Sequence, residues 1–112
     1  MPVNLEGYLK LLDGDQKVAY NIINGFLGEL NKQISIIKSR IVEKDLEAIH
    51  REAHSIKGGA LNIMATNLMN AAKELEMYTK SGNLENATVL LENLKKEYLK
   101  VKKYVEKYLK IF

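Results

Sequence analysis

Residues 84–112 read LENATVLLENLKKEYLKVKKYVEKYLKIF, and apolar residues recur in this stretch at alternating spacings of three and four. The recurring positions are Leu84, Ala87, Leu91, Leu94, Tyr98, Val101, Val105, Tyr108 and Phe112. In a helix this repeat places all of these side chains on one face, which packs along neighbouring helices at a shallow angle. The segment therefore predicts one long helix of a helical bundle.

Three further segments, residues 15–42, 45–63 and 66–80, have the same spacing. Their expected inward positions are Ala19, Ile23, Phe26, Leu30, Ile34, Ile37, Ile41, Leu46, Ile49, Ala53, Ile56, Ala60, Ile63, Leu68, Ala71, Leu75 and Tyr78. Helix-ending and N-capping residues lie between them, at 13–15, 43–45, 62–66 and 81–83. Short connections make neighbouring helices antiparallel. We expect an all-α single domain over residues 1–112, an antiparallel four-helix bundle with an additional short N-terminal helix at residues 3–12.

Composition narrows the function classes. The chain of 112 residues has no cysteine, which excludes disulfides, thiolate metal sites and a cysteine nucleophile. Its net charge of +3 is small for a nucleic-acid binder, and no apolar run is long enough for a membrane span. We expect a cytoplasmic protein with no nucleic-acid or membrane partner. Lysines crowd the last segment among glutamates, as on a solvated helix face, although membrane or nucleic-acid contact stays an alternative: Lys95, Lys96, Lys100, Lys102, Lys103, Lys107 and Lys110.

Both histidines lie in the run IHREAHSIKGGA at residues 49–60. If Ile49, Ala53 and Ile56 face the core, His54 is rotated by about 100° from it and is exposed. An exposed imidazole is nucleophilic near neutral pH and can accept a phosphoryl group. Lys57 is its helical neighbour and would offset the phosphate charge. Gly58 and Gly59 either leave bare backbone for a partner to approach or let two helices pack closely.

A metal site and an enzyme active site are the competing interpretations of this run. His50 and His54 share a helix face, as zinc-binding helices require, but Arg51 stands where the peptidase motif has glutamate. With no third histidine and no cysteine, we expect no metal, and we interpret His50 as a surface or boundary residue. Phosphate-loop, dinucleotide and nucleophile-elbow motifs are also missing. We therefore expect no ATP-binding or kinase activity of the chain's own.

The run Ala53-His54-Ser55-Ile56-Lys57-Gly58 closely resembles the Ala-His-x-Leu/Ile-Lys-Gly signature of histidine-containing phosphotransfer domains. Asn62, Ala65 and the pair Leu75-Glu76 also fall where that family often has the same residues, and the helical plan is similar over essentially the whole chain. Met64 departs from the pattern, because many members have glycine in this turn.

The resemblance implies a phosphocarrier of a multistep two-component phosphorelay. His54 would accept a phosphoryl group from the aspartate of a receiver domain, often in a hybrid sensor kinase, and pass it to a response-regulator aspartate. Lys57 would stabilise the phosphate charge. The receiver would supply Mg²⁺, and this chain would hold no cofactor or metal. The expected docking surface comprises His50, Arg51, Gly58, Gly59, Ala60, Leu61, Ile63 and Met64.

Two alternatives remain open from the sequence. The run from Ser55 to Ala60 is also similar to the phosphoacceptor domain of chemotaxis kinases, in which an ATP-binding domain would phosphorylate His54. A non-catalytic helical adaptor, which docks without carrying phosphate, is the other. We expect a monomer, with a dimer through residues 104–112 as the alternative if that end projects from the bundle.

Overall fold

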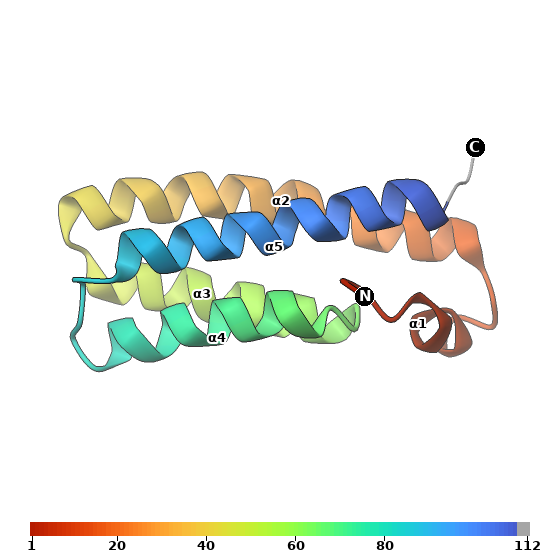
Figure 1. Cartoon of the computed structure of the whole chain (residues 1–112), viewed down its shortest axis with the longest axis horizontal. Coiled ribbons are helices and arrows are strands. Elements are labelled where there is room, and N and C mark those ends of the chain that lie inside the picture. The colour runs from red at the N-terminus through yellow and green to blue at the C-terminus, as the bar shows by residue number, and fades with distance from the viewer. Residues whose placement is uncertain (110–112) are drawn as a thin grey trace.

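The structure is a computed structural model that describes residues 1–109 (Figure 1). All regular elements of this part of the chain are helices: α1 (Leu5–Leu11), α2 (Gln16–Glu43), α3 (Leu46–Asn62), α4 (Thr66–Lys80) and α5 (Ala87–Tyr108). The predicted short leading helix and four long helices are thus confirmed, as are the four breaks between them. Lys110 of the predicted lysine face and Phe112 of the predicted apolar repeat lie outside the described residues.

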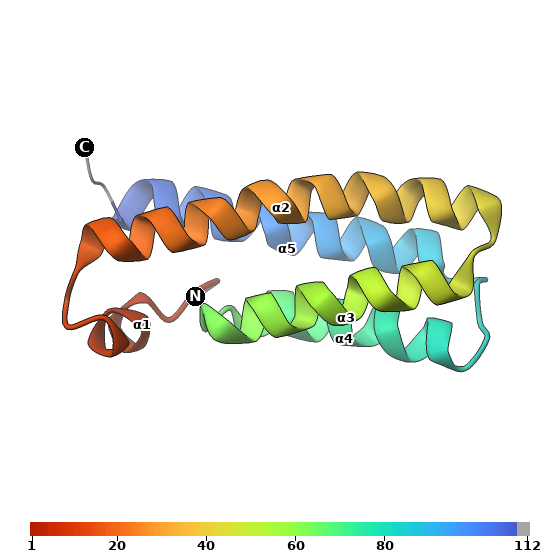
Figure 2. The ribbon, with the colours of Figure 1, turned by 180° about the vertical axis from the view of Figure 1, so that it is seen from behind.

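The four long helices form an antiparallel bundle. Figure 1 shows α2 and α5 side by side above α3 and α4, and Figure 2 shows the same layers from behind. The 28 residues of α2 span about 42 Å at 1.5 Å per residue, which matches the 43 Å long dimension of the molecule. Because α3 and α4 are shorter, α2 and α5 extend past them at one end, where α1 lies (Figure 1).

Helix ends follow local chemistry. Asp15 and Asp45 cap α2 and α3, accepting from the backbone amides of Val18 and Ala48 at 3.1 Å each. The capping prediction was wrong at the next two helices. Ala65 is the N-cap of α4 and makes no side-chain bond, and α5 begins at Ala87 instead of residue 84. Its start is delayed because the Asn83 side chain accepts from the backbone amide of Glu85 at 2.9 Å, which forms a turn there.

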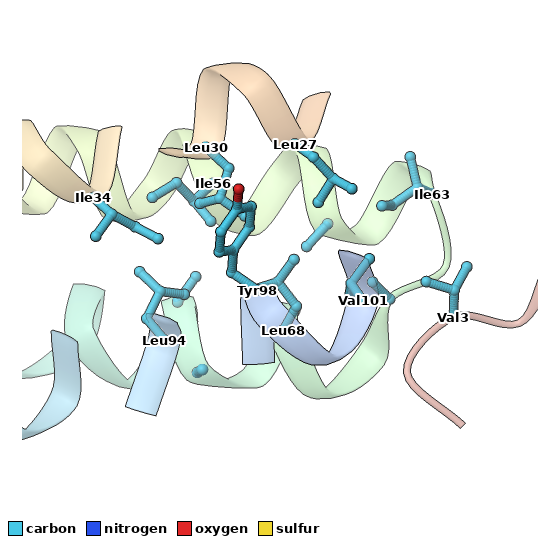
Figure 3. Close-up of a cluster of buried hydrophobic side chains, with 14 of the residues drawn as sticks. Val3, Leu27, Leu30, Ile34, Ile56, Ile63, Leu68, Leu94, Tyr98 and Val101 are labelled. Atoms are coloured by element: carbon cyan, nitrogen blue, oxygen red, sulfur yellow. The ribbon is translucent and has the colours of Figure 1, made fainter. Parts of the chain in front are cut away.

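The predicted apolar repeat forms the core. Figure 3 shows Leu30 and Ile34 of α2, Ile56 of α3, Leu68 of α4, and Leu94 and Tyr98 of α5 around one interior. Two predicted core residues were wrong, because Tyr78 is 38% exposed and Tyr108 is 56% exposed. The residue after each tyrosine is buried, since Thr79 is 4% and Leu109 is 1% exposed. The buried face has shifted to the following residue, because a strict seven-residue repeat drifts by about 20° per heptad around a straight helix. Within the described residues, no helix is both long and apolar enough to cross a membrane.

Candidate functional site

His54 projects from the middle of α3, beside the core. Ile49, Ala53 and Ile56 are completely buried, whereas 66% of the His54 side chain is exposed. The predicted rotation of this residue away from the core is confirmed. The imidazole is therefore accessible to a large partner while its backbone belongs to a rigid helix.

Glu76 of α4 joins the two predicted reactive side chains. It is only 8% exposed. Its Oε2 atom hydrogen-bonds Nδ1 of His54, and its Oε1 atom accepts from the ammonium of Lys57 at 2.6 Å. Burial alone would raise the pKa of this carboxyl, but the hydrogen bonds and charges of Lys57 and His54 outweigh burial and hold the pKa below its usual value. Glu76 is therefore a carboxylate at neutral pH.

The carboxylate determines which nitrogen of His54 is reactive. An ionised carboxylate only accepts hydrogen bonds, so Nδ1 of His54 carries the proton that faces Glu76. In the neutral ring, Nε2 then has the free lone pair. The arrangement orients the imidazole and presents Nε2 as a nucleophile.

His50 lies one turn before His54 and has a similar arrangement. Its Nδ1 atom lies 3.3 Å from the backbone carbonyl oxygen of Glu76, which can only accept, so Nδ1 donates. Its ring is half-buried and stacks 6.4 Å from the ring of His54. Among residues 1–109, no three His, Cys, Asp or Glu side chains come together closely enough to hold a metal ion.

A basic cleft of about 770 Å³ opens between α3 and α4 beside His54. It is lined by His50, Arg51, His54, Lys57, Lys73, Glu76, Met77 and Lys80. Apart from Glu76 and Met77, every one of these residues carries or can acquire a positive charge. The cleft is therefore suited to an anion.

The adjacent glycines serve different purposes. A Cβ atom at Gly58 would meet nothing within 4 Å, so this position is bare, exposed backbone beside the site. A Cβ atom at Gly59 would overlap the ring of Phe26 on α2. Both interpretations of the pair are thus right, one for each residue: Gly59 allows close packing of α2 on α3, and Gly58 leaves open surface.

The predicted docking surface needs a correction at two residues. Ala60, on the inward face of α3, is 0% exposed, and Ile63, the C-cap of α3, is 2% exposed. Both belong to the core, so neither can contact a partner. Leu61 is 63% exposed, Arg51 is also exposed, and Met64 is half-buried. Met64 has φ of 60°, the left-handed conformation that glycine adopts easily, so the turn keeps its shape without a glycine.

Sequence reasoning gave no role to Glu76, Lys73 or Lys80. The sequence analysis identified Glu76 only as part of the Leu-Glu pair that resembles the family, and Glu76 lies 22 residues from His54 in the chain. Its contact depends on the register in which α4 packs against α3, which no local spacing reveals. The sequence contains one indication of this contact, because Glu76 is a charged residue on the apolar face of α4, next to Leu75.

Comparison with known proteins gives two matches. The family model described as "Hpt domain" matches residues 21–104. The crystal structure of histidine-containing phosphotransfer protein B (HptB) from Pseudomonas aeruginosa PAO1 is similar to this chain with a TM-score of 0.87 and 23% sequence identity. That match covers 95% of this chain and 92% of the other, and it confirms the fold. No curated protein matches the chain.

Proposed function

The chain belongs to the Hpt domain family, and on that premise we propose that it is a phosphocarrier that holds a phosphoryl group on His54. Its partners are receiver domains of a two-component phosphorelay, one that donates the group from an aspartate and one that accepts it. The observation that carries the proposal is the exposed imidazole of His54, fixed through Nδ1 by the buried Glu76 carboxylate. We place this activity in the cytoplasm.

The transfer step uses the free lone pair of His54. Nε2 attacks the phosphorus of the aspartyl phosphate, the P–Nε2 bond forms, and the P–O bond to the aspartate breaks. The aspartate leaves as a carboxylate, and the ring becomes positively charged. The Glu76 carboxylate stabilises that charge through the proton on Nδ1. The reverse of this step passes the phosphoryl group to the next receiver.

The two partners divide the remaining work. Phosphoryl transfer depends mainly on positioning and on neutralising charge. We propose that the receiver supplies its acidic pocket and Mg²⁺, and that this chain supplies a rigid, oriented nucleophile and adjacent cations. Because the chain needs no ATP site for this step, it acts as a carrier and not as a kinase.

Intact mass measured before and after incubation with a phosphorylated receiver tests the proposal. We expect a gain of one phosphoryl group, labile in acid, on the peptide that contains His54. A parallel incubation with a histidine-kinase ATP-binding domain and ATP should give no gain. Label from the kinase alone would instead assign His54 to a chemotaxis-type phosphoacceptor domain. If neither donor labels the chain, the remaining interpretation is an adaptor that docks without carrying phosphate.

Replacement of Glu76 by glutamine should alter the pH dependence of stability. The folded pKa of Glu76 lies below its ordinary value of 4.5, so its carboxylate stabilises the fold above pH 4.5, and this contribution is lost as the pH falls through the folded pKa. We expect Glu76→Gln to lower the free energy of unfolding by about 1–2 kcal/mol at pH 7 and by much less at pH 3. Urea denaturation at the two pH values measures this, and an equal loss at both would contradict it.

A further inference from the structure

Lys57 is already engaged before any phosphate arrives. Its ammonium lies 2.6 Å from Oε1 of Glu76, and 29% of its side chain is exposed. The positive charge of Lys57 is therefore largely offset by the same carboxylate that holds His54. A phosphoryl group on Nε2 brings close to two negative charges. Together with the Glu76 carboxylate, these exceed the positive charges of Lys57 and of the phosphorylated ring by about one, so about one negative charge is left for further cations to neutralise.

Two lysines of α4 meet this need. Lys73 and Lys80 are both exposed and both line the cleft that contains His54. They lie three residues before and four residues after Glu76, at spacings where a lysine can pair with a glutamate on a helix. Yet both oxygens of Glu76 are taken by His54 and Lys57. Among residues 1–109, neither Lys73 nor Lys80 has a carboxylate within 4 Å.

The other cation on the cleft rim is placed differently. Arg51 forms a pair with Glu47 one turn earlier on α3, at 3.8 Å. Lys73 and Lys80 are flexible point charges on the opposite wall, and they can reach a group that projects from α3 into the cleft. The cleft volume of about 770 Å³ easily admits a phosphoryl group.

We propose that Lys73 and Lys80 form the binding site for the phosphoryl group on His54, so that α3 supplies the acceptor atom and α4 supplies the neutralising charge. This inference rests on the proposed phosphorylation of His54 and assigns two new residues to it. Lys57 then acts as a positioning residue, which holds the Glu76 carboxylate against Nδ1 of His54.

Phosphoramidate provides a test that needs no receiver. Nε2 of His54 displaces ammonia, so that the P–N bond of phosphoramidate breaks and a P–Nε2 bond forms. The ³¹P NMR signal, identified by its absence in His54→Gln, is then followed as a function of pH at low ionic strength. Near neutral pH it reports the acid dissociation constant of the phosphorylated imidazolium ring, which nearby cations increase because they disfavour the positive charge of the ring.

The test compares Lys73→Gln/Lys80→Gln with Lys95→Gln/Lys96→Gln. The second pair lines a separate groove between α4 and α5, and both variants remove two positive charges. We expect the α4 variant to lower the dissociation constant about threefold to tenfold, from two partly exposed ion pairs, and the α5 variant to change it by less than about twofold.

Equal changes in the two variants, or no change in either, would overturn the inference. Failure of transfer from receivers, with the contrast between the variants intact, would overturn the proposed function and leave the lysine site standing.

Discussion

His54→Gln is expected to abolish phosphoryl acceptance from a receiver while the bundle stays folded. The glutamine amide has no nucleophilic lone pair comparable to that of imidazole Nε2, so no covalent intermediate forms. Because 66% of the His54 side chain is exposed and its main contact is with Glu76, we expect the free energy of unfolding to change by no more than about 1 kcal/mol. Intact mass after incubation with a phosphorylated receiver, together with urea denaturation, measures both effects.

His50→Gln is the matched control, because His50 is on the same helix face and its ring stacks on that of His54. Its ring makes one hydrogen bond to α4, in which it donates to the backbone carbonyl oxygen of Glu76. A glutamine amide can donate the same hydrogen bond. We expect acceptance within about threefold of the unsubstituted chain. Loss of the phosphoryl label in His50→Gln, together with its retention in His54→Gln, would show that His50 is the phosphoacceptor and would contradict our assignment of His54.

The fold could be predicted from sequence because its main determinant is periodic. Apolar residues spaced alternately by three and four positions are sufficient to predict the inward faces of α2 to α5. The same pattern predicts that His54 points away from the core. The pattern fails near the ends of α4 and α5, where the buried face shifts to the following residue, Thr79 or Leu109, because a strict seven-residue repeat drifts around a straight helix. Tyr108 continues the repeat of α5 and is nevertheless 56% exposed.

The site could be predicted only in part, because it is assembled from two helices. One run of α3 contains His54, Lys57 and Gly58, and the family resemblance identifies them. Glu76 comes from α4, and its contact with His54 depends on the relative register of two helices joined at the Met64 turn. Ala60 and Ile63 were wrongly included in the docking surface. They are close to His54 in sequence, but both face the core.

Gly58→Glu has the second large expected effect, a loss of transfer without a loss of folding. Gly58 lies one turn after His54 on the same face of α3, and a Cβ atom there meets nothing within 4 Å. Replacing a glycine inside a helix should raise the free energy of unfolding by about 0.5–1 kcal/mol. A receiver must bring its phosphorus to about 3–3.5 Å from Nε2, and a displacement of about 1 Å can cost about 100-fold in rate.

A glutamate at position 58 places a long side chain and a negative charge where the acidic pocket of the receiver would approach. We therefore expect the rate of transfer from a phosphorylated receiver to fall about 100-fold or more. Asn93→Glu, on the exposed face of α5, adds the same charge and should leave the rate within about twofold. Phosphoramidate separates docking from chemistry, because this small donor needs no surface at Gly58. If Gly58→Glu reacts normally with phosphoramidate and slowly with the receiver, the substitution blocks docking. If both reactions are lost, the substitution has damaged His54 itself. Normal transfer from the receiver would show that docking does not use this face.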